Sequence, residues 1–212
     1  MKFFLKTAVG ALLITATAFA NAAFINFDSY SITGYASQDK AGSAYTEDGG
    51  YTLTLEGNQW VDIDLTSTIS SDTILSFTFI ATGLNAELYG IAFDNDNSYN
   101  FNAMNEFVFV GGSQTGDITT ANTVDTYTSG DGSVTYNIAI GDLFTGTFDR
   151  IVFILDNDAN ESGSFASFSD VEFCTTSSPC STSVVDVNAP SNLALVGMFF
   201  ILTAFIRRRV AK

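Results

Sequence analysis

The sequence predicts an all-β domain, folded as an antiparallel β-sandwich of the jelly-roll type, with an N-terminal signal peptide and one C-terminal hydrophobic helix. Short segments alternate apolar and polar residues, and turn-forming residues recur about every ten positions. The 212 residues include 20 phenylalanines, and the middle of the chain has no sustained helical stripe. Roughly nine or ten such strands suit two packed sheets, with a closed barrel as the alternative.

The strands follow one another with turn chemistry between them. The alternating segments are expected to be half-buried strands with one face in water, and they span residues 51–55, 61–65, 76–80 and 164–173. The more continuously apolar strands are expected at 88–93, 106–110, 134–140 and 150–155. Gly, Asp, Asn and Ser favour turns, and they cluster at 48–50, 111–112, 129–132 and 157–160.

The N-terminal segment, residues 1–23, has the three parts of a secretory signal peptide. Lys2 and Lys6 make a positive start, an apolar stretch follows from Ala8 to Ala20, and Ala20-Asn21-Ala22 is a small-x-small cleavage pattern. Cleavage after Ala22 or Ala23 would start the mature protein near Phe24. We therefore expect an exported protein with a β-sandwich domain at residues 24–175.

The C-terminal segment, residues 190–212, has the pattern of a membrane-inserted tail. It follows a polar linker at 176–189, and its uncharged run from Leu193 to Ile206 ends directly at Arg207, Arg208 and Arg209. Fourteen helical residues span about 21 Å, less than the roughly 30 Å of a hydrocarbon core, and flanking residues can extend the span. Arginines mark the cytoplasmic side, which places the domain outside the inner membrane.

A short proline-containing motif, an apolar helix and terminal arginines together resemble the PEP-CTERM sorting signal of Gram-negative bacteria. The resemblance implies recognition by an exosortase-type membrane enzyme and a place at the cell surface or in an exopolysaccharide matrix. In this chain Asn188-Ala189-Pro190 stands where the family has Pro-Glu-Pro. The tail is therefore either a signal read by a variant sorting enzyme or a permanent anchor.

The charge distribution excludes one class of partner. All 23 acidic residues lie between Asp28 and Asp186, with only Lys40 and Arg150 as basic residues in that span, an excess of 21 negative charges. Such a field repels nucleic acid and attracts cations, so we expect no nucleic-acid partner. The chain has two cysteines, Cys174 and Cys180, which in an oxidising compartment are predicted to close a small disulfide loop.

Two Asp-rich turns follow apolar strands and are candidate Ca²⁺ sites. Asp94 and Asp96 are two residues apart, as are Asp156 and Asp158. In a turn such pairs can converge on one ion, and hard oxygen ligands in a flexible loop suit Ca²⁺. The chain has no histidine, so zinc is not expected. A further candidate combines early and late segments, which meet in jelly rolls: Glu47, Asp48 and Asp170.

We predict no catalytic residues. Nucleophile systems that use histidine are excluded by composition, and no acidic residue stands within an apolar run that would suggest a raised pKa. Paired carboxylates could serve a glycosidase, but 23 acidic residues supply too many pairs for any one pair to be informative. The pair Asp149-Arg150 is expected at the surface.

Four blocks of the middle domain resemble carbohydrate-binding-type accessory modules of secreted polysaccharide-degrading enzymes and peptidases. They are residues 47–60, 90–97, 146–158 and 165–173. The resemblance implies a jelly roll, a structural Ca²⁺ and polysaccharide as partner. Sugar-binding modules stack sugar rings on exposed aromatic side chains. Trp60 is expected to be buried, and the remaining candidate platforms are Tyr89, Tyr99 and Tyr127.

Three functions remain open. The first is a non-catalytic exported surface or matrix protein whose β-sandwich binds or associates with polysaccharide. The second is a structural, acidic, calcium-stabilised envelope protein without a glycan ligand, and the third is a small glycosidase.

Overall fold

The computed structural model describes residues 23–100, 104–114 and 121–181. The predicted tail and nearly all of the predicted signal peptide lie outside these residues, as does the linker beyond residue 181, so all three stay predictions. The strands of the described part are β1 (Ile32–Gly34), β2 (Ala41–Glu47), β3 (Thr52–Ile63), β4 (Ser67–Ile69), β5 (Thr73–Gly83), β6 (Leu88–Asp94), β7 (Phe107–Gly111), β8 (Asn122–Tyr127), β9 (Val134–Ile138), β10 (Gly146–Phe148), β11 (Arg150–Asp156) and β12 (Ser164–Thr175).

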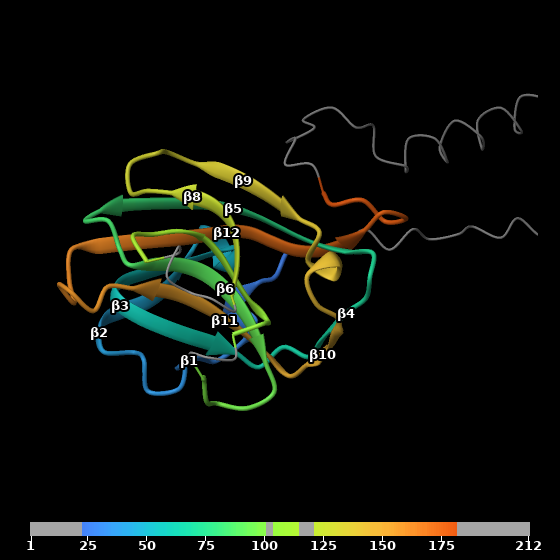
Figure 1. Ribbon diagram of the computed structural model, residues 1–212, viewed down its shortest axis with the longest axis horizontal. Coiled ribbons are helices and arrows are strands. Elements are labelled where there is room, and N and C mark those ends of the chain that lie inside the picture. The colour runs from blue at the N-terminus through green and yellow to red at the C-terminus, as the bar shows by residue number, and fades with distance from the viewer. Residues whose placement is uncertain (1–22, 101–103, 115–120, 182–212) are drawn as a thin grey trace, which may run out of the picture. The chain divides into compact units, whose positions relative to one another are not determined.

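These strands form a β-sandwich of the jelly-roll class, as predicted (Figure 1). Sheet A contains β1, the second half of β3, β11, β6, β7 and β8, and sheet B contains β2, the first half of β3, β12, β5 and β9. Strands β4 and β10 pair separately. The pairs are antiparallel except β7 and β8, which are parallel.

Strand β3 joins the two sheets because it bends at Gly57. Gly57 faces Gly42 across the β2–β3 pair, and both have positive φ, 88° and 100°. A Cβ at Gly57 would come within 2.5 Å of the Ala41 carbonyl oxygen, so only glycine permits the bend. The two strands predicted at 51–55 and 61–65 are therefore one continuous strand of 12 residues.

The prediction that one face of β3 contacts water is wrong. Thr52 and Thr54 are buried beside the carboxylates of Asp48 and Glu47, which accept hydrogen bonds from their hydroxyls at 2.8 Å each. Asp62 is buried in an ion pair with Arg150. Polar residues at alternate positions predicted a solvent-exposed face. In the structure these side chains are buried, and they hydrogen-bond to other side chains instead of water.

The main core lies between the sheets, and a second apolar cluster covers the outer face of sheet A. In β11, Ile151, Phe153 and Leu155 point into the main core, whereas Val152 and Ile154 belong to the second cluster. Burial on both faces explains why residues 151–155 of this strand are all apolar. The buried residues of the second cluster are Tyr35, Trp60, Leu88, Ala92, Met104, Phe107, Phe109, Val152 and Ile154.

Short 3₁₀ turns and a disulfide complete the domain. The turns are η1 (Phe27–Ser29), η2 (Asp48–Gly50) and η4 (Ile140–Asp142), the last of which ends the strand predicted to reach residue 140. Cys174, near the end of β12, and Cys180, which follows the strand, form the predicted disulfide, with their Cα atoms 5.0 Å apart.

Within residues 23–100, 104–114 and 121–181, the structure has no helix of the length and apolar character needed to cross a membrane.

Candidate ligand pocket on the outer face of sheet A

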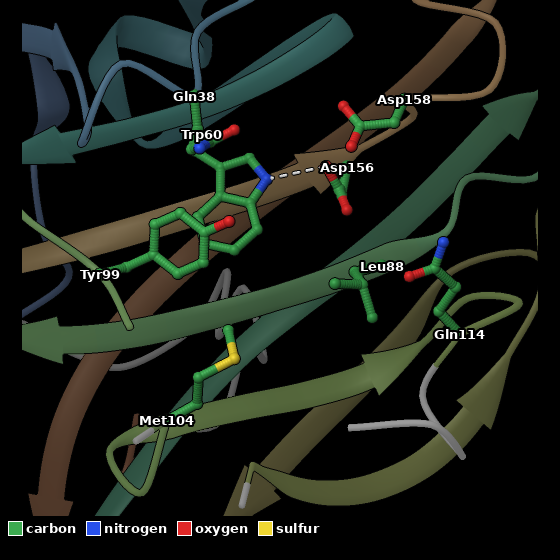
Figure 2. A pocket seen from close by; sticks show the side chains of 8 residues that line it. All are labelled: Gln38, Trp60, Leu88, Tyr99, Met104, Gln114, Asp156 and Asp158. Atoms are coloured by element: carbon green, nitrogen blue, oxygen red, sulfur yellow. Dashed lines mark hydrogen bonds between the residues drawn. The ribbon is translucent and has the colours of Figure 1, made fainter. Parts of the chain in front are cut away.

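A pocket of about 170 Å³ opens where three neighbouring segments of sheet A meet (Figure 2). The pairing of β3, β11 and β6 sets Trp60 beside Ile154 and Leu88 beside Asp156. Figure 2 shows the side chains of Trp60 and Tyr99 along one side, with Asp156 and Asp158 together at another. The lining residues are Gln38, Trp60, Leu88, Tyr99, Met104, Gln114, Asp156 and Asp158.

The aromatic wall consists of Trp60 and Tyr99, whose ring centroids are 5.2 Å apart at a tilt of 43°. Trp60 is only 3% exposed, so its predicted burial is confirmed, and Tyr35 stacks nearly parallel to it at 6.4 Å. Tyr99 is only partly buried. The aromatic surface offered to a ligand therefore comes mainly from Tyr99.

The acidic corner of the pocket brings together Glu87, Asp156 and Asp158, with one carboxylate oxygen from each within 4.8 Å of the others. Each carboxylate accepts a hydrogen bond from a neutral side chain. Trp60 Nε1 donates to Asp156 at 3.2 Å, and Asn58 Nδ2 donates to Asp158 at 2.7 Å. Gln114 Nε2 donates to Glu87 at 2.8 Å. The carboxylates are thus oriented without a positive charge.

This environment raises the pKa of Asp156 from 3.8 to about 6. Burial is the largest cause, because Asp156 is only 8% exposed and its charged form loses hydration. The neighbouring charges of Asp158 and Glu87 raise the pKa further, while the Trp60 hydrogen bond opposes them. The expectation that no acidic residue has a raised pKa is therefore wrong. Burial and the Asp158 and Asp156 charges also raise the pKa of Tyr99.

The one ion pair among the described residues lies at the opposite end of β11. There Arg150 pairs with Asp62, which is 1% exposed and also accepts a 2.5 Å hydrogen bond from Thr33 Oγ1. The expected surface pair of Asp149 and Arg150 is thus replaced by a largely buried pair. Burial is the largest single influence on the pKa of Arg150 and lowers it, but the neighbouring carboxylates, Asp62 first, together outweigh burial and raise the pKa.

Asp94 and Asp96 have the same sequence spacing as Asp156 and Asp158 but different surroundings. Asp94 accepts a 2.8 Å hydrogen bond from the Tyr35 hydroxyl, and Asp96 accepts bonds from the backbone and hydroxyl of Ser98 at 2.9 and 2.7 Å. In the described part of the chain, no third carboxylate, histidine or cysteine joins them in a cluster. The Tyr35 pKa is raised, first by burial and then by its hydrogen bond to Asp94.

Glu47, Asp48 and Asp170 are linked through β3 and β12. Glu47 and Asp48 accept hydrogen bonds from Thr54 and Thr52, and the backbone N–H of Asp170 donates to the Tyr51 carbonyl at 3.1 Å. Asp48 and Asp170 have positive φ, 54° and 53°. Their carboxylates do not form a compact cluster of the kind found at Glu87 within the described residues. Calcium at this end of the sandwich stays a prediction.

Sequence reasoning missed Glu87, Gln38 and Gln114 as pocket residues. No local pattern marks them, because the pairing of β6 with β11 is what brings Glu87 to Asp156: the Glu87 N–H donates to the Asp156 carbonyl at 2.7 Å. Of the candidate aromatic platforms, Tyr89 and Tyr127 are buried in the main core, and Tyr99 alone lines the pocket.

No protein-family model and no curated protein matches this chain. Among solved structures, a variant of a family 29 carbohydrate-binding module is 15% identical, with a TM-score of 0.42 over 79% of this chain and 96% of its own. Another variant of that module, complexed with mannohexaose, is 18% identical, with a TM-score of 0.39 over 72% and 88%.

The second N-terminal cellulose-binding domain of β-1,4-glucanase C from Cellulomonas fimi is 12% identical, with a TM-score of 0.37 over 81% of this chain and 100% of its own. Because every one of these TM-scores is below 0.5, the fold assigned to this chain rests on its own strand pairing, and its function rests on its own pocket.

Proposed function

We propose that this chain is a non-catalytic, exported β-sandwich protein that binds polysaccharide in the pocket on the outer face of sheet A. The observation that supports this best is the combination of a partly exposed tyrosine with amide and carboxylate side chains around one small hollow. Ligand pockets typically combine an apolar surface with a few placed polar groups. This pocket has both.

The chemistry of the lining suits a sugar ring. The flat face of Tyr99 can cover the apolar C–H face of a pyranose. Asp158 and Gln114 can hydrogen-bond to ring hydroxyls from the edge of the pocket, and bonds to a carboxylate are stronger because they are charge-assisted. A volume of about 170 Å³ suits one ring of a chain better than an enclosed oligosaccharide.

The arrangement of the carboxylates favours binding over hydrolysis. Glycosidases place two carboxyl groups on either side of the bond to be cleaved. Here Asp156 and Asp158 lie together at one corner of the pocket, and a Trp60 hydrogen bond holds Asp156. We therefore propose that the domain is not an enzyme.

The two ends of the chain supply the proposed location. The N-terminal pattern at 1–23 supports export, and the run from Leu193 to Ile206 with Arg207–Arg209 supports at least transient anchoring in the inner membrane. The resemblance of this tail to the PEP-CTERM signal supports an exosortase-type partner and a final place at the surface or in the matrix of a Gram-negative bacterium.

A polysaccharide retention assay on the purified full chain tests the binding proposal. We expect Tyr99→Ala to reduce retention about tenfold, whereas Tyr45→Ala leaves it unchanged, since Tyr45 is 41% exposed on β2 of sheet B. No retention on any polysaccharide, or equal losses in both variants, would refute binding at this pocket. Release of reducing sugar by the wild-type chain would revive the glycosidase hypothesis.

A second candidate is a structural envelope protein that calcium stabilises and that has no glycan ligand. The excess of 21 negative charges with only two basic residues in the same span favours it, because self-repulsion destabilises the folded state unless cations bind. A large fall in melting temperature on adding a chelator, together with no glycan retention, would support this candidate.

A further inference from the structure

We propose that the pocket on the outer face of sheet A selects sugar residues that carry no negative charge, and that Asp158 is a residue that determines this specificity. The inference rests on the proposed function, because it names the class of polysaccharide that the pocket accepts: neutral polymers, and not polyuronates or sulfated polymers. The acidic side chains act here by excluding anions, and this role requires no bound cation.

The first observation is the charge of the hollow. Among the described residues that line it, the charged ones are Asp156 and Asp158, and Glu87 brings a third carboxylate oxygen within 4.8 Å of theirs. The described residues include only two basic ones, Lys40 and Arg150, and neither lines the pocket. Arg150 lies at the other end of β11, in an ion pair. A carboxylate that entered the hollow would therefore meet like charges with no cation of the protein beside them.

The second observation is that two hydrogen-bond donors of the hollow are already used by its own carboxylates. The indole N–H of Trp60 donates to Asp156 at 3.2 Å, and Gln114 Nε2 donates to Glu87 at 2.8 Å. The bond to Glu87 fixes which end of the Gln114 amide is the oxygen, and Figure 2 shows that oxygen on the side of Leu88. The surface offered to a ligand is therefore rich in acceptors. Sugar hydroxyls can donate to it, whereas ionised carboxylate and sulfate groups only accept.

The size of the hollow keeps salt from cancelling this repulsion. A volume of about 170 Å³ is that of a space roughly 6 Å across, which is less than the screening length of about 8 Å at physiological ionic strength. Asp156 is also largely buried, and buried charges are screened much less than exposed ones.

Charge and hydrogen-bonding capacity therefore select in the same direction. Like charges that are brought together at a binding site suppress the binding of the mismatched partner. A uronic acid on the face of Tyr99 would carry its carboxylate into a space that two aspartates line. A neutral sugar avoids this repulsion, keeps the contact with the tyrosine ring and donates its hydroxyl protons to the acceptors.

Retention of the purified full chain on matched polymers tests this specificity. The probes are a neutral glucan, mannan and galactan, each compared with the same polymer after oxidation of its primary hydroxyls to carboxylates, at physiological ionic strength with a chelator present. We expect the oxidised form of a retained polymer to bind more weakly by about tenfold or more. An oxidised polymer that is retained as well as its neutral parent would overturn the specificity and leave polysaccharide binding intact. Retention of none of these polymers would overturn both the proposed function and the specificity that rests on it.

Asp158→Asn separates the effect of the pocket from that of the charge of the whole domain. Asp158 is exposed, and an asparagine oxygen can still accept the hydrogen bond from Asn58, so the variant should fold. We expect it to narrow the ratio of neutral to oxidised binding about threefold or more, because one of the like charges is gone. Tyr99→Ala should weaken the binding of both forms about equally, since it removes the contact that they share.

Asp96→Asn is the matched control, because it removes one exposed aspartate from the corresponding turn after β6, outside the pocket lining. It changes the net charge of the domain by the same amount, so it should leave the ratio of neutral to oxidised binding unchanged. Equal narrowing in Asp158→Asn and Asp96→Asn would assign the exclusion of anions to net charge and overturn the role of the pocket. Narrowing confined to Asp158→Asn supports it.

Discussion

Two buried aspartates point outward from sheet A, and their surroundings differ in one respect. Asp62 is 1% exposed and has Arg150 as its partner, with Thr33 donating a hydrogen bond beside it. Asp156 is 8% exposed and has only the neutral indole of Trp60, with two further carboxylates nearby. Burying a charge is costly unless it is paired. The end of the sheet with Arg150 therefore has a cation of its own, whereas among the described residues no ion pair forms at the end with Asp156.

The largest effect on stability is expected from removing Arg150, the cation that pairs with Asp62. Arg150→Ala leaves Asp62 buried and unpaired, and breaking a buried ion pair in this way costs about 3–5 kcal/mol of the free energy of unfolding. Urea denaturation measures it. Lys40→Ala is the control, since a surface substitution should change stability by less than about 0.5 kcal/mol. Adding Asp62→Asn to the Arg150→Ala variant should recover part of the loss, and a loss below about 1 kcal/mol would show that the pair is not important for stability.

The second prediction concerns the pH dependence of the free energy of unfolding that Asp156 causes, measured with a chelator present to remove metal ions. Its folded pKa, about 6, is above the value of 3.8 expected in the unfolded chain. As the pH rises between these values the unfolded state loses its proton first, so stability from this group is full below about pH 4 and is lost by about pH 7. The shift corresponds to about 3 kcal/mol.

Asp156→Asn isolates this contribution from that of the other acidic residues. The free energy of unfolding should fall less steeply between pH 4 and 7 in the variant than in the wild type, by on the order of 2–3 kcal/mol in total. Asp96→Asn should retain the wild-type slope. Identical slopes in wild type and Asp156→Asn would mean that Asp156 is not destabilised by burial.

The sequence predicted the strands of this region better than it predicted the site. Residues 88–93 and 151–155 carry no charge and are largely apolar, and both lie in strands. The turns at Asp94-Asn-Asp and Asp156-Asn-Asp have the same local pattern, so no local rule could tell them apart. What separates them is a partner distant in the sequence: the Tyr35 hydroxyl at Asp94, and Glu87 at Asp156. The register of β6 against β11 decides this, and a single sequence does not report it.

The third prediction tests whether the hydrogen bond from the neutral Trp60 indole stabilises the charged form of Asp156, as a cation would. Trp60→Phe removes the indole N–H, and a lost hydrogen bond to a charged group costs about 1.5–3 kcal/mol. The variant should lose about 2 kcal/mol at pH 7, and the pKa of Asp156 should rise further, since the Trp60 bond lowers it. Circular dichroism during urea denaturation at several pH values measures both effects.

Phe109→Leu is the control for packing alone, because Phe109 is fully buried in the same outer cluster but donates no hydrogen bond. It should reduce stability equally at every pH. If Trp60→Phe also gives a pH-independent loss, the indole contributes packing and not charge stabilisation.

The smallest effect is expected from giving the Asp156 end its own cation, which would make the two ends of the sheet alike. Gln114 Nε2 lies 2.8 Å from Glu87 Oε1, so Gln114→Lys can place an ammonium group among the three carboxylates. At a pocket edge such a pair contributes about 0.5–1 kcal/mol. With a chelator present, the variant should be more stable than wild type by this amount, and its melting temperature should respond less to added Ca²⁺.

Asn137→Lys is the control, because it adds the same charge on the exposed face of β9 in sheet B, away from the pocket. An equal gain in both variants would assign the effect to net charge, whereas a gain confined to Gln114→Lys would show that the acidic corner lacks a cation.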